Sequence, residues 1–69
     1  YTADLMRQGI NKIAQKVGEE AVEVVVAALA ENKEAFVNES ADLLYHLILL
    51  LSVRNVYWEE VLSCLEARR

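Results

Sequence analysis

Five acidic side chains are spaced as divalent-metal ligands often are. Glu19, Glu20 and Glu23 interrupt a segment otherwise rich in valine and alanine, and Glu39 and Asp42 repeat the i, i+3 spacing further along. In a helix, Glu20 and Glu23 project about 60° apart and Glu19 and Glu23 about 40° apart, so all three point to one side. Two facing helices would then concentrate five negative charges, which cations must neutralise. The pattern predicts a metal site.

Magnesium suits this donor set better than iron does. Mg²⁺ takes few carboxylates, retains water and bridges to substrate phosphates. Di-iron bundles commonly use Glu-x-x-His pairs on two helices, whereas this chain has one histidine, His46, four residues after Asp42. The simpler alternative is a set of solvated glutamates, in which Lys16 pairs with Glu19 or Glu20 for a few tenths of a kcal/mol.

Three further polar side chains have two readings each. Lys12 and Lys16 lie one helical turn apart beside the acids, so they either bind phosphate or pair with the carboxylates. His46 stands in a leucine-rich run, where it is either a group next to the metal ligands or the substrate, or a core histidine whose hydrogen bonds are satisfied.

The elements that would position these groups are helices. The chain has no proline and two glycines, and alanine, leucine, valine and glutamate dominate, which predicts an all-α fold. A short polar connection around Asn32, which can cap the next helix, implies that the two long helices are antiparallel neighbours. Asn55 suits the left-handed conformation at a helix end. The expected helices are Tyr1–Gln8 with Thr2 as its N-cap, Ile10–Ala30, Lys33–Val53 and 56–67.

Apolar residues exceed what so small a chain can easily hide. With 69 residues it is one domain, spanning 1–69, and a domain of this size buries only about 60% of the surface exposed by its unfolded chain. Yet 55% of the residues are hydrophobic. The helix expected over Ile10–Ala30 carries one apolar stripe around Ile13 and a second patch around Val25, so it should be buried on two sides. An antiparallel bundle completed by homodimerisation is therefore predicted.

Charge and cysteine usage bound the partners and the compartment. A net charge of −4 argues against nucleic acid, because phosphate backbones need a basic surface. The single cysteine, Cys64, cannot form an intramolecular disulfide, and nothing resembles a leader peptide, so a cytoplasmic protein is expected. The most apolar run, Leu43–Val53, is about half the length needed to cross a bilayer, which favours core over membrane.

Two motifs resemble a known enzyme family. The acidic pattern EExxE followed by ExxD is typical of the MazG-like all-α pyrophosphohydrolase superfamily, and KIAQKVGEEAxE with ADLLYHL resembles phosphoribosyl-ATP pyrophosphohydrolase. The resemblance extends over nearly the whole chain, with Asn55 and Tyr57 in the last loop as minor departures. It implies a dimeric helical bundle that uses Mg²⁺ to hydrolyse phosphoribosyl-ATP to phosphoribosyl-AMP and pyrophosphate in histidine biosynthesis.

The resemblance also implies roles for individual residues. Glu20, Glu23, Glu39 and Asp42 would ligate the metal. Glu19, Glu20 and Glu23 would form the catalytic group, with Glu19 as a further ligand or as the carboxylate that orients a water molecule. Lys12 and Lys16 would contact phosphate. Two alternatives remain: a related pyrophosphohydrolase acting on ordinary or damaged nucleoside triphosphates, and a non-enzymatic helical interaction module.

Overall fold

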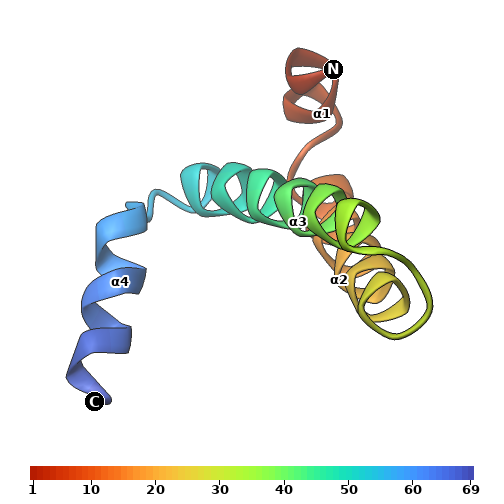
Figure 1. Ribbon diagram of the computed structural model, residues 1–69. Helices are drawn as coiled ribbons and strands as arrows, with labels where there is room; N and C mark the ends of the chain where they lie inside the picture. The colour runs from red at the N-terminus through yellow and green to blue at the C-terminus, as the bar shows by residue number, and fades with distance from the viewer.

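Four helices and no strands form the chain in the computed structural model, which describes residues 1–69 (Figure 1). The expected all-α fold is confirmed, and the two long helices have the expected bounds. The two short helices begin later than expected, by one residue and two residues. The helices are α1 (Thr2–Gln8), α2 (Ile10–Ala30), α3 (Lys33–Val53) and α4 (Trp58–Ala67).

The expected cap of α3 is confirmed, whereas that of α1 is wrong. Asn32 accepts a hydrogen bond from the backbone N–H of Ala35 at 2.9 Å, which satisfies one of the free donors at the start of α3. Thr2 is instead the first residue of α1, where its hydroxyl is hydrogen-bonded to the hydroxyl of Tyr45 on α3. The Thr2 side chain therefore joins two helices instead of capping one.

The turn between α3 and α4 depends on one left-handed residue. Asn55 has a φ of 60°, as expected for an asparagine that ends a helix. Two residues later the Tyr57 N–H donates to the Glu60 carboxylate at 2.8 Å, which satisfies a free donor at the start of α4. The turn directs α4 away from α2 (Figure 1).

The core lies where α2 packs against α3 and α1 packs against α2. Leu5 of α1 and Ile13 and Ala27 of α2 are its buried apolar side chains, and Ile13 is completely enclosed. The apolar stripe expected along α2 is buried only in part, because Ile10 is 38% exposed near its first turn and Ala28 is exposed near its last. The second apolar patch, around Val25, is uncovered in the single chain.

The single chain exposes more surface than a compact monomer of its mass. Its accessible surface is 5226 Å², against about 4,400 Å² expected for a folded monomer of this mass. Its radius of gyration is 13.4 Å, against about 11 Å for a compact domain. Helix α4 packs against no other helix extensively, and its Leu62 and Leu65 stay 41% and 53% exposed.

Helix α3 is long and apolar enough to cross a bilayer by length and composition alone. It has 21 residues, its most apolar stretch has a mean hydropathy of 1.3, and only 6% of that stretch is buried within the chain. The apolar run Leu43–Val53 is only part of α3, so the expectation based on that run underestimated the length of the apolar helix. Core helices of water-soluble proteins meet the same criterion, so the observation is weak evidence for a membrane segment.

Gly9 sets the direction in which α1 leaves α2, and its replacement should destabilise the fold. Its φ of 90° and ψ of 179° belong to a region that is essentially restricted to glycine. We expect Gly9→Ala to lower the free energy of unfolding by about 1–3 kcal/mol, measured by urea denaturation.

Gly18 provides the matched control. It lies inside α2, and a Cβ added there meets nothing within 4 Å, so no neighbouring atom of the single chain requires a glycine at this position. Gly18→Ala should stabilise the chain by up to about 1 kcal/mol, because alanine is the better helix former. Equal effects of the two substitutions would contradict the role given to the Gly9 conformation.

Candidate metal centre

Three of the four expected metal ligands lie together between the two long helices. Glu20 and Glu23 project from the middle of α2 toward Glu39 in the first half of α3, and one carboxylate oxygen from each lies within 4.8 Å of the others. The antiparallel pairing of α2 and α3 causes this meeting, because the centre of one helix then faces the early part of the next. Glu20 is buried, with 7% exposure, and Glu39 is half-buried.

Two of these carboxylate oxygens have no hydrogen-bond donor. Glu20 Oε2 and Glu39 Oε2 are both buried without a partner. An unpaired buried carboxylate oxygen is costly, so such groups usually bind donors or cations. A set of carboxylate oxygens is also the donor set that hard divalent cations prefer. The residues therefore fit Mg²⁺.

The pKa of Glu20 is raised above its ordinary value of 4.5. The hydrogen bond with Glu23 is the largest cause, followed by burial and the negative charge of Glu23, while the charge of Asp42 contributes less and Lys16 opposes the shift. Two close carboxylates cannot both ionise without a penalty, so they tend to share a proton. A bound cation would reduce the repulsion between the two carboxylates, as the shared proton does.

Asp42 and Glu19 lie outside the three-residue cluster. The Asp42 side chain is exposed, although its charge acts on Glu20. Glu19 accepts a hydrogen bond from Gln15 at 2.9 Å, and its pKa is lowered mainly by this bond, with the charges of Lys16 and Lys12 adding to the effect. Glu19 is therefore held ionised on the same side of α2 as Lys12 and Lys16.

Lys16 connects the acidic cluster to a pocket between α1 and α2. Its Nζ lies 3.6 Å from carboxylate oxygens of both Glu19 and Glu20. Partial burial acts to lower the pKa of Lys16, but the proximity of Tyr1 and the charges of the two glutamates outweigh it and raise the pKa. The pocket has a volume of about 270 Å³, and Lys12, Lys16 and Glu19 line its α2 side. The two lysines thus line the same pocket, next to the acids.

His46 is buried with both ring nitrogens hydrogen-bonded. Nδ1 lies 2.7 Å from the backbone carbonyl of Asp42, and since a carbonyl only accepts, Nδ1 carries the proton. Nε2 then accepts from the Tyr1 hydroxyl at 2.6 Å. The rings of Tyr1 and Tyr45 both meet the imidazole edge to face. His46 contacts the main chain of an expected metal ligand and joins α3 to the start of the chain.

Sequence reasoning missed the contribution of α1 to the site. Tyr1, Asp4 and Gln8 line the pocket together with the lysines. Their position depends on the backbone of Gly9, because that residue fixes the angle between α1 and α2. No residue spacing within α1 indicates that angle.

The stability of the metal-free chain should depend on pH through Glu20. Because the folded state raises the pKa of Glu20, it binds this proton more tightly than the unfolded chain does. The stabilisation by the Glu20 proton is fully present below pH 4.5, the ordinary pKa of the side chain. It is lost as the pH rises through 4.5 and then through the raised pKa of the folded state. Glu20→Gln, which stays neutral, should gain stability relative to the unmodified chain as the pH rises toward 7.

Urea denaturation from pH 4 to pH 7, followed by circular dichroism, measures this difference. The difference between the free energies of unfolding of the two proteins cancels the contribution of the other acidic groups, which both proteins share. Mg²⁺ should stabilise the unmodified chain at pH 7 more than it stabilises the variant. A difference in the free energy of unfolding that stays constant across the pH range would contradict the assigned shift.

Sequence comparisons identify the family. The family model of phosphoribosyl-ATP pyrophosphohydrolase matches residues 1–69. The chain belongs to this family. It is 51% identical to a phosphoribosyl-ATP pyrophosphatase of Saccharolobus solfataricus and 49% identical to one of Saccharolobus islandicus, in matches that cover all of this chain and 73% of each relative. An Ignicoccus hospitalis relative of the same description is 46% identical over 99% of this chain and 67% of its own length.

Membership of this family confirms the resemblance seen in the two motifs. The chain is an enzyme, so the interpretation as a non-enzymatic interaction module is set aside. The carboxylates expected to bind metal therefore lie in an enzyme whose family acts on a pyrophosphate linkage. The roles of the individual residues remain predictions.

Proposed function

We propose that the chain hydrolyses phosphoribosyl-ATP to phosphoribosyl-AMP and pyrophosphate, with Mg²⁺ held by Glu20, Glu23, Glu39 and Asp42. Family membership supports the reaction. The observation that carries the metal assignment is the pair of buried carboxylate oxygens without donors, in a cluster where three acids meet. Such oxygens fit a hard cation, and the substrate brings a polyphosphate that requires one.

The bound metal would neutralise the polyphosphate and lower the pKa of an attacking water. The residues of the chain have separate tasks around it. Glu20 and Glu39 each supply a buried carboxylate oxygen whose position is fixed by the packing of α2 on α3. Glu19, kept ionised by Gln15 and Lys16, orients the water and accepts its proton. Lys16 and Lys12 bind phosphate groups of the substrate.

A panel of substrates tests the proposal. Pyrophosphate release should occur with phosphoribosyl-ATP and Mg²⁺, and should stop when the metal is removed by a chelator. Release should be far slower with ATP or with an oxidised nucleoside triphosphate. Equal rates for all three substrates would favour the alternative enzyme that acts on ordinary or damaged nucleotides, and no release from any would overturn the proposal.

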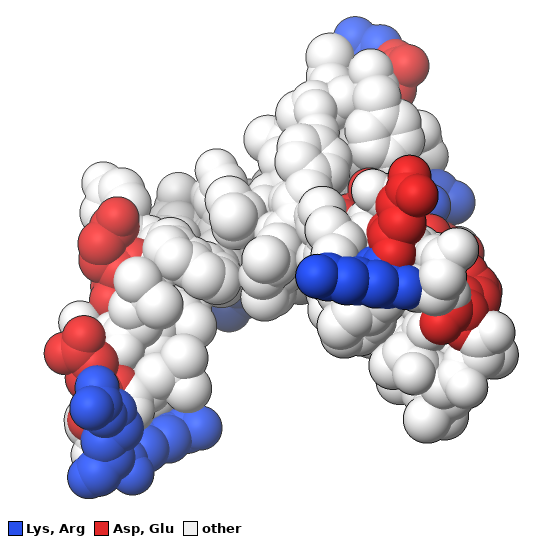
Figure 2. All heavy atoms as spheres, viewed as in Figure 1, with Lys and Arg blue, Asp and Glu red and all other residues white.

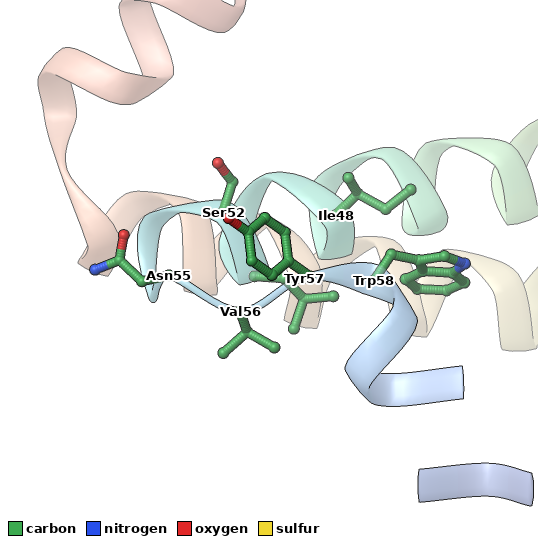
Figure 3. Close-up of a pocket in the computed structure, with 7 residues that line it drawn as sticks. Ile48, Ser52, Asn55, Val56, Tyr57 and Trp58 are labelled. Atoms are coloured by element: carbon green, nitrogen blue, oxygen red, sulfur yellow. The ribbon is translucent and has the colours of Figure 1, made fainter. Parts of the chain in front are cut away.

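We infer that the working form is a homodimer in which a second copy covers the exposed apolar faces. The surface of the single chain exceeds the compact value by about 800 Å², which matches the share of one partner in a standard interface. Figure 2 shows an almost uncharged face over the second half of α3, between the charged side chains near the start of this helix and those of α4. A pocket of about 370 Å³ is lined by Ile48 of α3 together with Val56 and Trp58 (Figure 3).

Burial in the proposed dimer explains why so long a helix as α3 is apolar, without requiring it to cross a membrane. Glu39, Asp42 and His46 lie within this helix, and an acidic cluster is costly in a bilayer core. A net charge of −4 supports the absence of nucleic acid among the partners. We propose a cytoplasmic enzyme, which suits a reaction on soluble nucleotides.

A further inference from the structure

The residues that line the pocket between α1 and α2 include a lysine without an ion-pair partner and an aspartate with one free carboxylate oxygen. Lys16 is engaged with Glu19 and Glu20, whereas Lys12 has no ion-pair partner within 4.0 Å. Across the pocket, Asp4 uses Oδ1 to pair with Arg7, which leaves Oδ2 without a hydrogen bond. An ammonium group suits a phosphate, and a carboxylate oxygen suits the hydroxyls of a ribose.

The pocket lies next to the metal centre but is distinct from it. Glu19 and Lys16 line the pocket, and Lys16 also contacts Glu20 of the acidic cluster. Along α2, however, Lys12 precedes Glu20 by eight residues, a rise of about 12 Å. An anion on Lys12 therefore lies further along the site than phosphates bound at the cluster.

The size of the pocket limits what it can hold. Its volume of about 270 Å³ is below the roughly 300–1,000 Å³ of pockets that enclose drug-sized ligands. It suits one phosphorylated sugar better than a whole nucleotide. The hydrogen bond from Tyr1 to His46 fixes the start of the chain against α3, so the α1 wall of the pocket has a defined position.

We propose that this pocket is the subsite for the phosphoribosyl group, with Lys12 binding its phosphate and Asp4 its ribose hydroxyls. The inference rests on the proposed function, because that substrate carries a phosphoribosyl group in addition to a triphosphate. The triphosphate occupies the metal centre and Lys16, and the second anionic end reaches Lys12. The pocket thereby distinguishes this substrate from ordinary nucleotides.

Two product-type ligands test the subsite without any hydrolysis. Phosphoribosyl-AMP and AMP differ only by the phosphoribosyl group, and their dissociation constants can be compared by isothermal titration calorimetry with the full chain. The unmodified protein should bind phosphoribosyl-AMP at least about tenfold more tightly. Lys12→Gln and Asp4→Asn should each remove most of this preference while changing AMP affinity less than about twofold. Lys33→Gln, the same charge change at the exposed start of α3, should leave the preference intact.

A second measurement needs no variant. Titration of the isotope-labelled chain with ribose 5-phosphate should shift the amide resonances of Gln8, Gly9 and Lys12 in nuclear magnetic resonance spectra. Shifts confined to other residues, or an equal loss of both affinities in Lys12→Gln, would overturn the subsite. Pyrophosphate release is measured separately. If the chain hydrolyses phosphoribosyl-ATP but binds phosphoribosyl-AMP and AMP equally well, the subsite alone is refuted. If it prefers phosphoribosyl-AMP but does not hydrolyse phosphoribosyl-ATP, the proposed reaction alone is refuted.

Discussion

Replacing Glu20 by glutamine should lower kcat/KM for phosphoribosyl-ATP by on the order of 100-fold or more. The substitution keeps the size of the side chain but removes the charge from the most buried carboxylate of the cluster. The affinity for Mg²⁺ should fall in parallel, because an amide is a poorer ligand for a hard cation. Initial rates of pyrophosphate release and calorimetric Mg²⁺ titrations measure the two effects.

Glu66→Gln provides the control for this result. It makes the same chemical change on the exposed surface of α4, remote from the acids, and should leave rate and metal affinity unchanged. The metal-free Glu20→Gln protein should also be more stable than the unmodified protein at pH 7, so lost activity cannot be attributed to unfolding. Full activity in Glu20→Gln would refute the metal assignment.

Leu44→Glu should break the proposed homodimer. Leu44 lies on α3 with 47% of its surface exposed in the single chain, and a second copy would bury it. Each dimer would then contain two buried, unpaired carboxylates, and burying an unpaired charge costs several kcal/mol. We expect the dissociation constant measured by sedimentation equilibrium to rise by at least about 100-fold.

The matched control lies on another side of the same helix. Asn38 is exposed and polar, so Asn38→Glu adds the same charge without placing it in the apolar face. It should leave the dissociation constant within about threefold of that of the unmodified protein, since surface charges interact weakly through water. If the unmodified chain sediments as a monomer, or if both variants dimerise normally, the proposed interface is wrong.

The helices and the meeting of the acids could be predicted because they follow from local patterns. Helical spacing defined α2 and α3, and Asn32 marked the turn between them by its capping chemistry. Because the connection between α2 and α3 is short, the two antiparallel helices can align side by side in only a few registers. Glu20, Glu23 and Glu39 accordingly lie close together, as their spacing indicated.

What the sequence did not indicate depends on angles between helices. The φ of 90° at Gly9 determines where α1 lies, and hence that Tyr1 reaches His46 and that Asp4 lines the same pocket as Lys12. Any glycine permits many angles, so its presence alone selects none. The departure of α4 depends in the same way on Asn55, whose left-handed backbone was foreseen while the direction it imposes was not.

The extended α4 makes folding and assembly one process in the proposed dimer. A ten-residue helix is too short to be stable in water by itself, and no other helix of its own chain packs extensively against it. In the proposed dimer this helix packs on the second copy, as in an exchange of elements between protomers. The melting temperature should therefore rise with protein concentration, so that dilution unfolds the C-terminal helix as it separates the subunits.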